Sequence, residues 1–323
     1  MPATHCSSLI APSRPPPHPP CCRAAADRGR RTLFFLLFSA ISCLAAPPPR
    51  SVVSQVHVVS IHVRDHAAFE ALFLFLRDVI QLPVLYGEPG KPGDAPRRRY
   101  AGFSVGNAYL EPCGPYATDA PFSAGQPMRF HGLTFASGLP LAESAEVLTG
   151  RGISHSPVIG GGPSMPRFVH VTDPLLIGRM QAVSIWELPN QEDRRTSLSV
   201  LPSVLREVRG GRLGVQRLAE VRIGCPDEAT SARWHSFLAP AKSGRGGWQI
   251  GNGPVLRLSP SEVPQVESIV LQVESLAKAR EFLSEQNLLG RTAHDSAELD
   301  AAKIWGLKIV LRESPEGGLR SKG

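Results

Sequence analysis

The sequence is poor in the motifs that mark thiolate metal sites and disulfide-rich domains. It contains no CxxC pair, and four of its six cysteines lie within the first 43 residues, which leaves only Cys113 and Cys225 for the rest of the chain. This usage argues against a disulfide framework and against a zinc site built from thiolates. No HExxH zinc-protease motif and no dinucleotide-binding fingerprint is present either.

A basic surface for nucleic acid is also lacking. The formal net charge is +7, but residues 1–45 carry five arginines against Asp27 alone and so contribute +4 of it. The remaining chain has little excess charge and no basic stripe with interleaved aromatic residues, which argues against a nucleic-acid partner. A hydrophobic content of 42% and a charged content of 20% are typical of a globular chain of about two domains.

No apolar run is long enough to cross a bilayer as a helix. The apolar stretch Leu33–Ala46 follows two arginines and precedes small residues, an arrangement typical of an export signal. Residues 1–31, rich in proline and arginine, are predicted to be disordered. Their length also fits an organelle transit peptide, or sequence upstream of the true start, in which case the protein would be cytoplasmic. Cys43 is a candidate site of lipid attachment.

The chain beyond residue 50 repeats one pattern four times: an apolar strand, a polar turn and an amphipathic helix. Apolar residues recur at period two in the strands and at three or four in the helices. The strand segments are VHVVSIHVRD (56–65), FHGLTFASG (130–138), EVRIGCPD (220–227) and ESIVLQVES (267–275). Further strand signals broken by glycine turns follow at 97–115, 167–190, 246–260 and 301–314. A tight Gly-Asn turn occurs at 106–107 and again at 251–252.

This repeat resembles the vicinal oxygen chelate superfamily, which includes glyoxalases, bleomycin-resistance proteins and dioxygenases. The resemblance implies an α+β fold with four βαβββ modules, paired into two glyoxalase-like half-barrel units that each form a cup. The domains expected are a disordered or targeting segment (1–50), a glyoxalase-like domain (51–190), a linker with a short helix (191–215), a second, degenerate glyoxalase-like domain (216–314) and a tail (315–323).

A divalent metal in the first cup is implied by the same resemblance. In the family each module contributes a histidine or glutamine from its first strand and a glutamate from its last, a ligand set that suits Zn, Fe, Mn or Ni. His131 lies seven residues before Gly138 and has the family's ligand spacing. Glu111 and Glu187 end strands where the family has its glutamates, and they are the candidate catalytic proton-transfer groups.

The first module departs from the family pattern, because the position seven residues before Asp65 is Val58. His62 alternates in phase with Val58 and Ser60, so it is predicted to point into the cup. His57 has the opposite phase, which places it on the helix-packed face unless a β-bulge turns it toward the metal.

Other residues complete the predicted pocket. Tyr109 and Trp186 adjoin the candidate ligands and either line the cup or pack in the core, and Ser60 and His170 are further pocket candidates. The second pair offers no matching set of histidine and glutamate. It is therefore expected to pack against the first pair, to support a homodimer, or to cover the pocket.

Two functions follow from these observations. The first is a metal-dependent lyase, isomerase or dioxygenase acting on a small oxygenated substrate, with the metal as Lewis acid. The second is a metal-free protein of the same fold that binds a small molecule, which the missing histidine at position 58 favours. The enzyme is the leading hypothesis, and convergence of His131, Glu111 and Glu187 is the feature that distinguishes it from the alternative.

Overall fold

The computed structural model describes residues 50–87, 99–115, 122, 125–160, 166–180, 182–187, 198–244 and 247–314. The described residues all lie within one compact unit, Pro48–Gly323. The predicted targeting segment with Cys43, the tail 315–323 and the first part of the predicted linker (191–197) lie outside the described residues. Within the described ranges, no helix is both long and apolar enough to cross a membrane.

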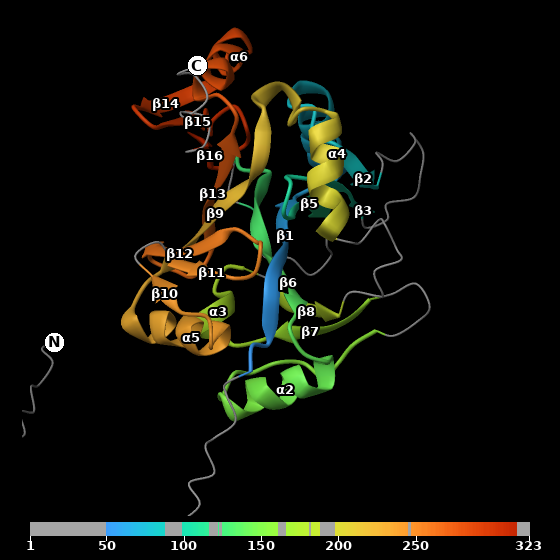
Figure 1. Cartoon of the computed structure of the whole chain (residues 1–323), viewed down its shortest axis with the longest axis vertical. Helices are drawn as coiled ribbons and strands as arrows, with labels where there is room; N and C mark the ends of the chain where they lie inside the picture. The colour runs from blue at the N-terminus through green and yellow to red at the C-terminus, as the bar shows by residue number, and fades with distance from the viewer. Residues whose placement is uncertain are drawn as a thin grey trace, which may run out of the picture. The chain divides into compact units, whose positions relative to one another are not determined.

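Modules 1 and 2 together build one eight-stranded sheet (Figure 1). Its order is β2-β4-β5-β1-β6-β8-β7, with β3 paired to β5. The first strands of the two modules, β1 and β6, lie antiparallel at the centre, and each is flanked by the last strand of its own module in parallel. The strands are β1 (Val53–Val63), β2 (Val84–Tyr86), β3 (Arg99–Tyr100), β4 (Gly102–Ser104), β5 (Tyr109–Gly114), β6 (Met128–Ser137), β7 (Arg167–Val171) and β8 (Ala182–Glu187).

Helices cover one face of this sheet. Asp65 begins α1 (His66–Leu74), because its carboxylate accepts a hydrogen bond from Ala68 N at 2.8 Å. The chain continues as a π-helical turn, η1 (Phe75–Val79), and the second module adds α2 (Leu141–Gly150) and the short α3 (Pro174–Ile177). Buried apolar residues of β1 and β6 alternate toward these helices. The opposite side of the sheet is called the inner face below.

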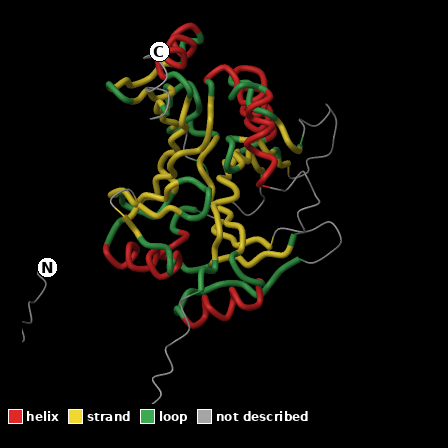
Figure 2. The backbone as a smooth tube through the Cα atoms, in the orientation of Figure 1, coloured by secondary structure: helices red, strands yellow, loops and turns green. Residues whose placement is uncertain are grey.

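Modules 3 and 4 form a second eight-stranded sheet in the order β10-β11-β12-β9-β13-β16-β15-β14. Its strands are β9 (Val215–Cys225), β10 (Ser243–Gly244), β11 (Gly247–Gln249), β12 (Val255–Pro260), β13 (Val266–Val273), β14 (Leu289–Ala293), β15 (Ser296–Leu299) and β16 (Ile309–Glu313). Its helices are α5 (Glu228–Leu238) and α6 (Leu276–Glu285), capped by Asp227 and Ser275. Figure 2 shows the strands in the middle of this view and the helices around them.

The predicted linker contains the expected short helix, α4 (Leu201–Glu207), preceded by the 3₁₀ turn η2 (Leu198–Val200) and followed by η3 (Gly211–Leu213). The two pairs pack through their helix-covered faces, where the Phe237 ring of α5 lies 5.4 Å from the Phe135 ring of β6. The first sheet lies within the expected first domain (51–190) and the second sheet begins in the last residue of the expected linker. The exact domain boundaries stay predictions.

Two parts of the strand prediction are wrong. In module 2 only β7 and β8 follow α2 among the described residues, and isolated bridges from His155 to Val171 and from Ile159 to Phe168 take the place of a third strand. In module 4 the segment 301–314 contains only β16, because its first six residues form turns that end at Gly306 with a φ of 91°. The two missing strands, β14 and β15, lie earlier in the chain.

Candidate functional site

A β-bulge in β1 positions His57. The register between β1 and β6 shifts from Val56 opposite Phe135 to Val58 opposite Thr134, which leaves His57 as the extra residue. Strict alternation places His57 on the helix-packed face, and that prediction is wrong because a bulge interrupts the alternation. The imidazole lies on the inner face instead, as the bulge alternative requires.

A row of rings crosses the inner face from β7 to β2. Phe168 lies 5.9 Å from Trp186, and Trp186 lies 6.2 Å from His57, measured between ring centroids. His57 then meets Tyr109 at 5.2 Å, and Tyr109 meets Tyr86 at 5.8 Å. Tyr109 and Trp186, predicted as pocket or core residues, are both members of this aromatic row, which offers flat apolar surfaces to a ligand.

Small polar side chains lie beside the aromatic row. On β6, between the strands that carry His57 and Trp186, the Thr134 hydroxyl lies 3.1 Å from that of Ser184 on β8. Ser60 is buried on β1 in register with Glu111. His170 is half-buried and packs on Phe168 at 4.7 Å, at the end of the row.

Glu111 and Tyr86 form a hydrogen-bonded pair at the other end of the row. The Tyr86 hydroxyl donates to Glu111 Oε2 at 2.5 Å, and Glu111 is only 9% exposed. Burial and the neighbouring carboxylate raise the pKa of Tyr86 well above its ordinary value, so the phenol stays protonated. Tyr86 was not predicted from the sequence, because β2 has three residues and therefore shows no alternation that could place a side chain.

Burial strongly perturbs the imidazole of His57. It is 4% exposed, and burial lowers its pKa from the ordinary 6.5 to about 4, so the ring is neutral near pH 7. Neither ring nitrogen has a hydrogen-bond partner among the described residues. A neutral imidazole with two unused nitrogens can donate one hydrogen bond and accept another.

His62 and His131 lie side by side deeper in the sheet. Their ring centroids are 5.0 Å apart, and both side chains are buried. The register between β1 and β6 shifts a second time. Ser60 lies opposite Gly132, but the next residue, Ile61, lies opposite Phe130. His131 is therefore the extra residue of a bulge in β6. The structure thus brings together two of the histidines predicted as metal ligands.

Glu187 is not brought to this site. It alternates with Trp186, so it has the phase of the core residues Val183 and Ile185 and belongs to the other face of β8. Its carboxylate accepts from Arg167 Nη1 at 2.9 Å, and its side chain is 35% exposed. The prediction that Glu187 joins His131 and Glu111 in one cup is therefore wrong; the position that faces inward carries Trp186.

The described residues do not form the expected metal centre. Among them no three histidine, cysteine, aspartate or glutamate side chains come close enough to hold one ion. His62 and His131 are adjacent, but Glu111 is engaged by Tyr86 and Glu187 lies on the other face. We therefore derive no step through a metal.

Helix α4 closes one side of the inner face. Leu201 is fully buried and packs with Val58 and Tyr109. The Ser104 hydroxyl donates to Leu201 O at 2.9 Å and thereby fixes the start of the helix.

Ser104 is the serine of the sequence GFSVG (102–106), which matches the GxSxG nucleophile pattern. Because Ser104 is fully buried at the end of a strand rather than exposed in a strand-to-helix turn, it is not a nucleophile.

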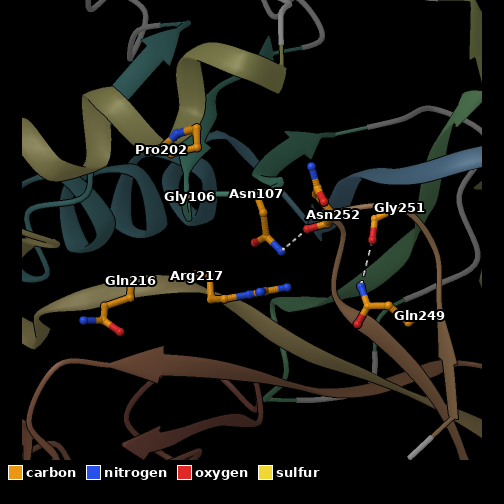
Figure 3. Close-up of a pocket in the computed structure, with 8 residues that line it drawn as sticks. All are labelled: Gly106, Asn107, Pro202, Gln216, Arg217, Gln249, Gly251 and Asn252. Carbon is orange, nitrogen blue, oxygen red and sulfur yellow. Dashed lines mark hydrogen bonds between the residues drawn. The ribbon is translucent and has the colours of Figure 1, made fainter. Parts of the chain in front are cut away.

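A polar pocket of about 460 Å³ lies where the two repeated Gly-Asn turns meet (Figure 3). Asn107 donates through Nδ2 to Leu218 O and to Asn252 O, both at 3.0 Å, and accepts from Leu218 N at 2.9 Å. These bonds join β4–β5 of the first pair to β9 and to the β11–β12 turn. The pocket is lined by Gly106, Asn107, Pro202, Gln216, Arg217, Gln249, Gly251 and Asn252. Since Asn107 is fully used in these contacts, we interpret the pocket as part of the interface.

The paired modules, with the first strands of two modules central in each sheet, form the fold expected from the repeat. Solved structures of homoprotocatechuate 2,3-dioxygenases share it. A mutant of the Brevibacterium fuscum enzyme matches with a TM-score of 0.53 at 13% identity, over 83% of this chain and 73% of that one. The anaerobic complex of the enzyme with 3,4-dihydroxyphenylacetate matches with a TM-score of 0.52 at 13% identity, over 82% of each chain.

The native enzyme from Arthrobacter globiformis matches with a TM-score of 0.50 at 14% identity, over 83% of this chain and 82% of that one. No protein-family model and no curated protein matches the sequence. The α+β fold expected from the repeat is therefore confirmed, and it is shared with these dioxygenases.

Proposed function

We propose that the protein binds a small aromatic compound bearing hydroxyl groups on the inner face of the first sheet, through hydrogen bonds and ring contacts. The observation that carries this proposal is the neutral, buried imidazole of His57, whose two nitrogens have no partner among the described residues. A buried polar group without a hydrogen bond costs about 1–3 kcal/mol, and a ligand hydroxyl would remove that cost.

The neighbours of His57 support an aromatic ligand. The rings of Trp186 and Tyr109 meet the imidazole edge-on, so a flat ring is the shape that this row can contact over a large area. The Tyr86–Glu111 pair at the end of the row offers a phenolic oxygen that can accept a further hydrogen bond. Partly exposed Trp186 and Phe168 mark the side from which a ligand would enter, since Leu201 closes the other side.

The similar dioxygenases agree with this ligand class, because one of them was solved with 3,4-dihydroxyphenylacetate. The metal-dependent lyase, isomerase or dioxygenase of the leading sequence hypothesis needs a ligand set that the described residues do not assemble. Binding without a metal is therefore the function that we put forward, and its metal independence is open to direct measurement.

Calorimetric titration with 3,4-dihydroxyphenylacetate, catechol and phenylacetate tests the proposal. We expect the two hydroxylated compounds to bind and phenylacetate to bind at least about tenfold more weakly, since it lacks hydroxyls for His57. His57→Phe keeps a flat ring in the row but removes both nitrogens, so it should weaken catechol binding by about tenfold.

Glu187→Gln is the matched control, because Glu187 was predicted at the same site but lies on the other face of β8. It should leave the affinity within about twofold. Binding should survive treatment with a chelator. Loss of binding after chelation, or equal losses in the His57 and Glu187 variants, would contradict the proposal and restore the metal hypothesis.

A further inference from the structure

The pocket in the interface is lined by both pairs of modules and by the helix between them. Its volume of about 460 Å³ lies within the range of about 300–1,000 Å³ that small-molecule sites occupy. The first pair supplies Gly106 and Asn107, α4 supplies Pro202, and the second pair supplies Gln216, Arg217, Gln249, Gly251 and Asn252. Apart from the glycines and the proline, these lining side chains are amides and one guanidinium, so the pocket suits a polar ligand.

Arg217 is the charged residue of this lining. Its Nη2 donates to Gly253 O at 3.1 Å, and no carboxylate lies within ion-pair distance of it in the part of the chain that the structure describes. The Nε is enclosed by protein atoms, whereas the Nη1 is not enclosed and has no hydrogen-bond partner among the described residues. Arg217 therefore brings a positive charge to the pocket and keeps a donor that a ligand can reach.

The acidic residues nearby in the fold are not partners of Arg217. Glu220, the next acidic residue along β9, accepts from Arg222 at 2.6 Å. Glu207 on α4 and Glu274 after β13 are exposed, and neither forms an ion pair with another described residue. The charge of Arg217 is thus not neutralised by a direct ion pair.

The first module shows that holding the turn does not require a charge. Gln55 and Arg217 lie at the same distance before the aspartates that cap the following helices, so they are equivalent positions. Strand pairing likewise makes Asn107 equivalent to Gly253. Gln55 Nε2 donates to Asn107 O at 2.9 Å, as Arg217 Nη2 donates to Gly253 O. A neutral amide therefore makes in the first pair the hydrogen bond for which the second pair uses a guanidinium.

Side-chain amides add further donors and acceptors around Arg217. Gln216 and Asn252 are exposed, and their amides form no hydrogen bond within the described ranges. Gln249 uses its Nε2 for two main-chain carbonyls of the β11–β12 turn, which leaves its Oε1 able to accept. In Figure 3, Gln216 and Asn252 lie on opposite sides of Arg217. Amides both donate and accept, so they match hydroxyl groups, which do the same.

We propose that this pocket binds a small carboxylic acid that carries several hydroxyl groups, such as a sugar acid. The carboxylate accepts from Arg217 and supplies the one negative charge that the lining lacks, and the hydroxyl groups bond to the amides of Gln216 and Asn252. A single cation favours a carboxylate over a phosphate group, which carries up to two negative charges. The site is separate from the inner face of the first sheet and does not rest on the function proposed there.

Calorimetric titration of the full chain with gluconate, at an ionic strength held constant with sodium chloride, tests the proposal. We expect saturable binding. Sorbitol offers a matching carbon chain with hydroxyl groups but no carboxylate, so it should bind at least about tenfold more weakly. Acetate offers a carboxylate without hydroxyl groups and should also bind at least about tenfold more weakly.

Arg217→Gln introduces the residue type that the first pair has at this position and removes the charge from the pocket. It should weaken gluconate binding by about tenfold, because a charge-assisted hydrogen bond is lost. Arg291→Gln is the matched control, since Arg291 is exposed on β14 and its substitution changes the net charge equally. It should leave the affinity within about twofold.

Asn252→Ala removes one of the two amides and keeps the main-chain carbonyl that Asn107 contacts, so the fold should be preserved. It should weaken gluconate binding by about threefold. This variant decides alone if Arg217→Gln fails to fold.

Absence of saturable gluconate binding would overturn the proposal and leave a pocket that only separates the two pairs. Equal affinities for gluconate and sorbitol would overturn it as well, because they would remove the role of Arg217. The same holds for equal losses in the Arg217 and Arg291 variants, which would show a general effect of net charge, and for an unchanged affinity in Asn252→Ala, which would place the ligand outside the pocket.

Discussion

At the scale of single residues, the buried imidazole of His57 links the proposed site to the pH dependence of stability. Its pKa in the folded chain is about 4, against an ordinary value of 6.5. Between these values the unfolded chain binds a proton that the folded chain does not, so stability is full above about pH 6.5 and falls as the pH drops toward 4.

We therefore predict that the free energy of unfolding falls by about 2 kcal/mol between pH 7 and pH 5 because of His57. Urea titrations at both pH values measure it, and His57→Phe should abolish this part of the loss. His235→Gln is the control, because His235 is exposed, and it should keep the full pH dependence. An unchanged pH dependence in His57→Phe would show that the imidazole is not the buried neutral group described.

Single residues also show which side-chain orientations could be predicted from the sequence and which could not. His62 and Ser60 are buried and alternate in phase on β1, as predicted. His131 was placed by family spacing alone, and it lies beside His62 because a bulge interrupts β6. His57 follows the bulge alternative of its prediction, whereas Glu187 lies one residue beyond the inward-facing position, which Trp186 occupies, and therefore belongs to the other face. No signal in a single sequence marks such a slip.

At the scale of secondary-structure elements, the four first strands were predictable because each is long, apolar and followed by a helix. The observed strands overlap all four predicted segments. Short strands such as β2 and β10 carry too few residues for periodicity, and β14 contains polar exposed residues that resemble a loop. Their pairing is decided by the neighbouring strand rather than by their own sequence.

The pairing of β6 with β8 depends on a glycine. A Cβ at Gly132 would lie 1.8 Å from Ala182 O in the adjacent strand. Gly132→Ala is therefore expected to force the strands apart and to lower the free energy of unfolding by about 2 kcal/mol or more. Gly150→Ala is the control, because a Cβ there meets nothing within 4 Å, and it should be neutral or stabilising by up to about 1 kcal/mol. Chemical denaturation of both variants measures the difference, and equal stabilities would contradict the close approach of the strands.

At the scale of the whole folded unit, Asn107 connects the two sheets. Its side chain is 9% exposed and makes three hydrogen bonds to main-chain atoms of Leu218 and Asn252. Asn107→Ala leaves these buried groups without partners, at about 1–3 kcal/mol for each group that stays unsatisfied. We expect the variant to lose cooperativity between the sheets, so that hydrogen exchange of β5 and β9 peptides, equally protected in the wild type, becomes unequal.

The equivalent turn in the second pair supplies the control for this prediction. Asn252 is exposed and contributes only its main-chain carbonyl to the contact with Asn107. Asn252→Ala should therefore keep the hydrogen bond and change the free energy of unfolding by less than about 0.5 kcal/mol. If both substitutions had the same effect on exchange, the side chain of Asn107 would not be the connection.

The central claim is that the inner face of the first sheet, at His57 and the Tyr86–Glu111 pair, is the ligand site of this molecule. A crystal structure of the complex with catechol or 3,4-dihydroxyphenylacetate tests it most directly. The account predicts a ligand hydroxyl within hydrogen-bond distance of a His57 ring nitrogen and the ligand ring against Trp186. Density for the ligand on the Glu187 face, at the second sheet, or on a metal ion held by His62 and His131 would contradict it.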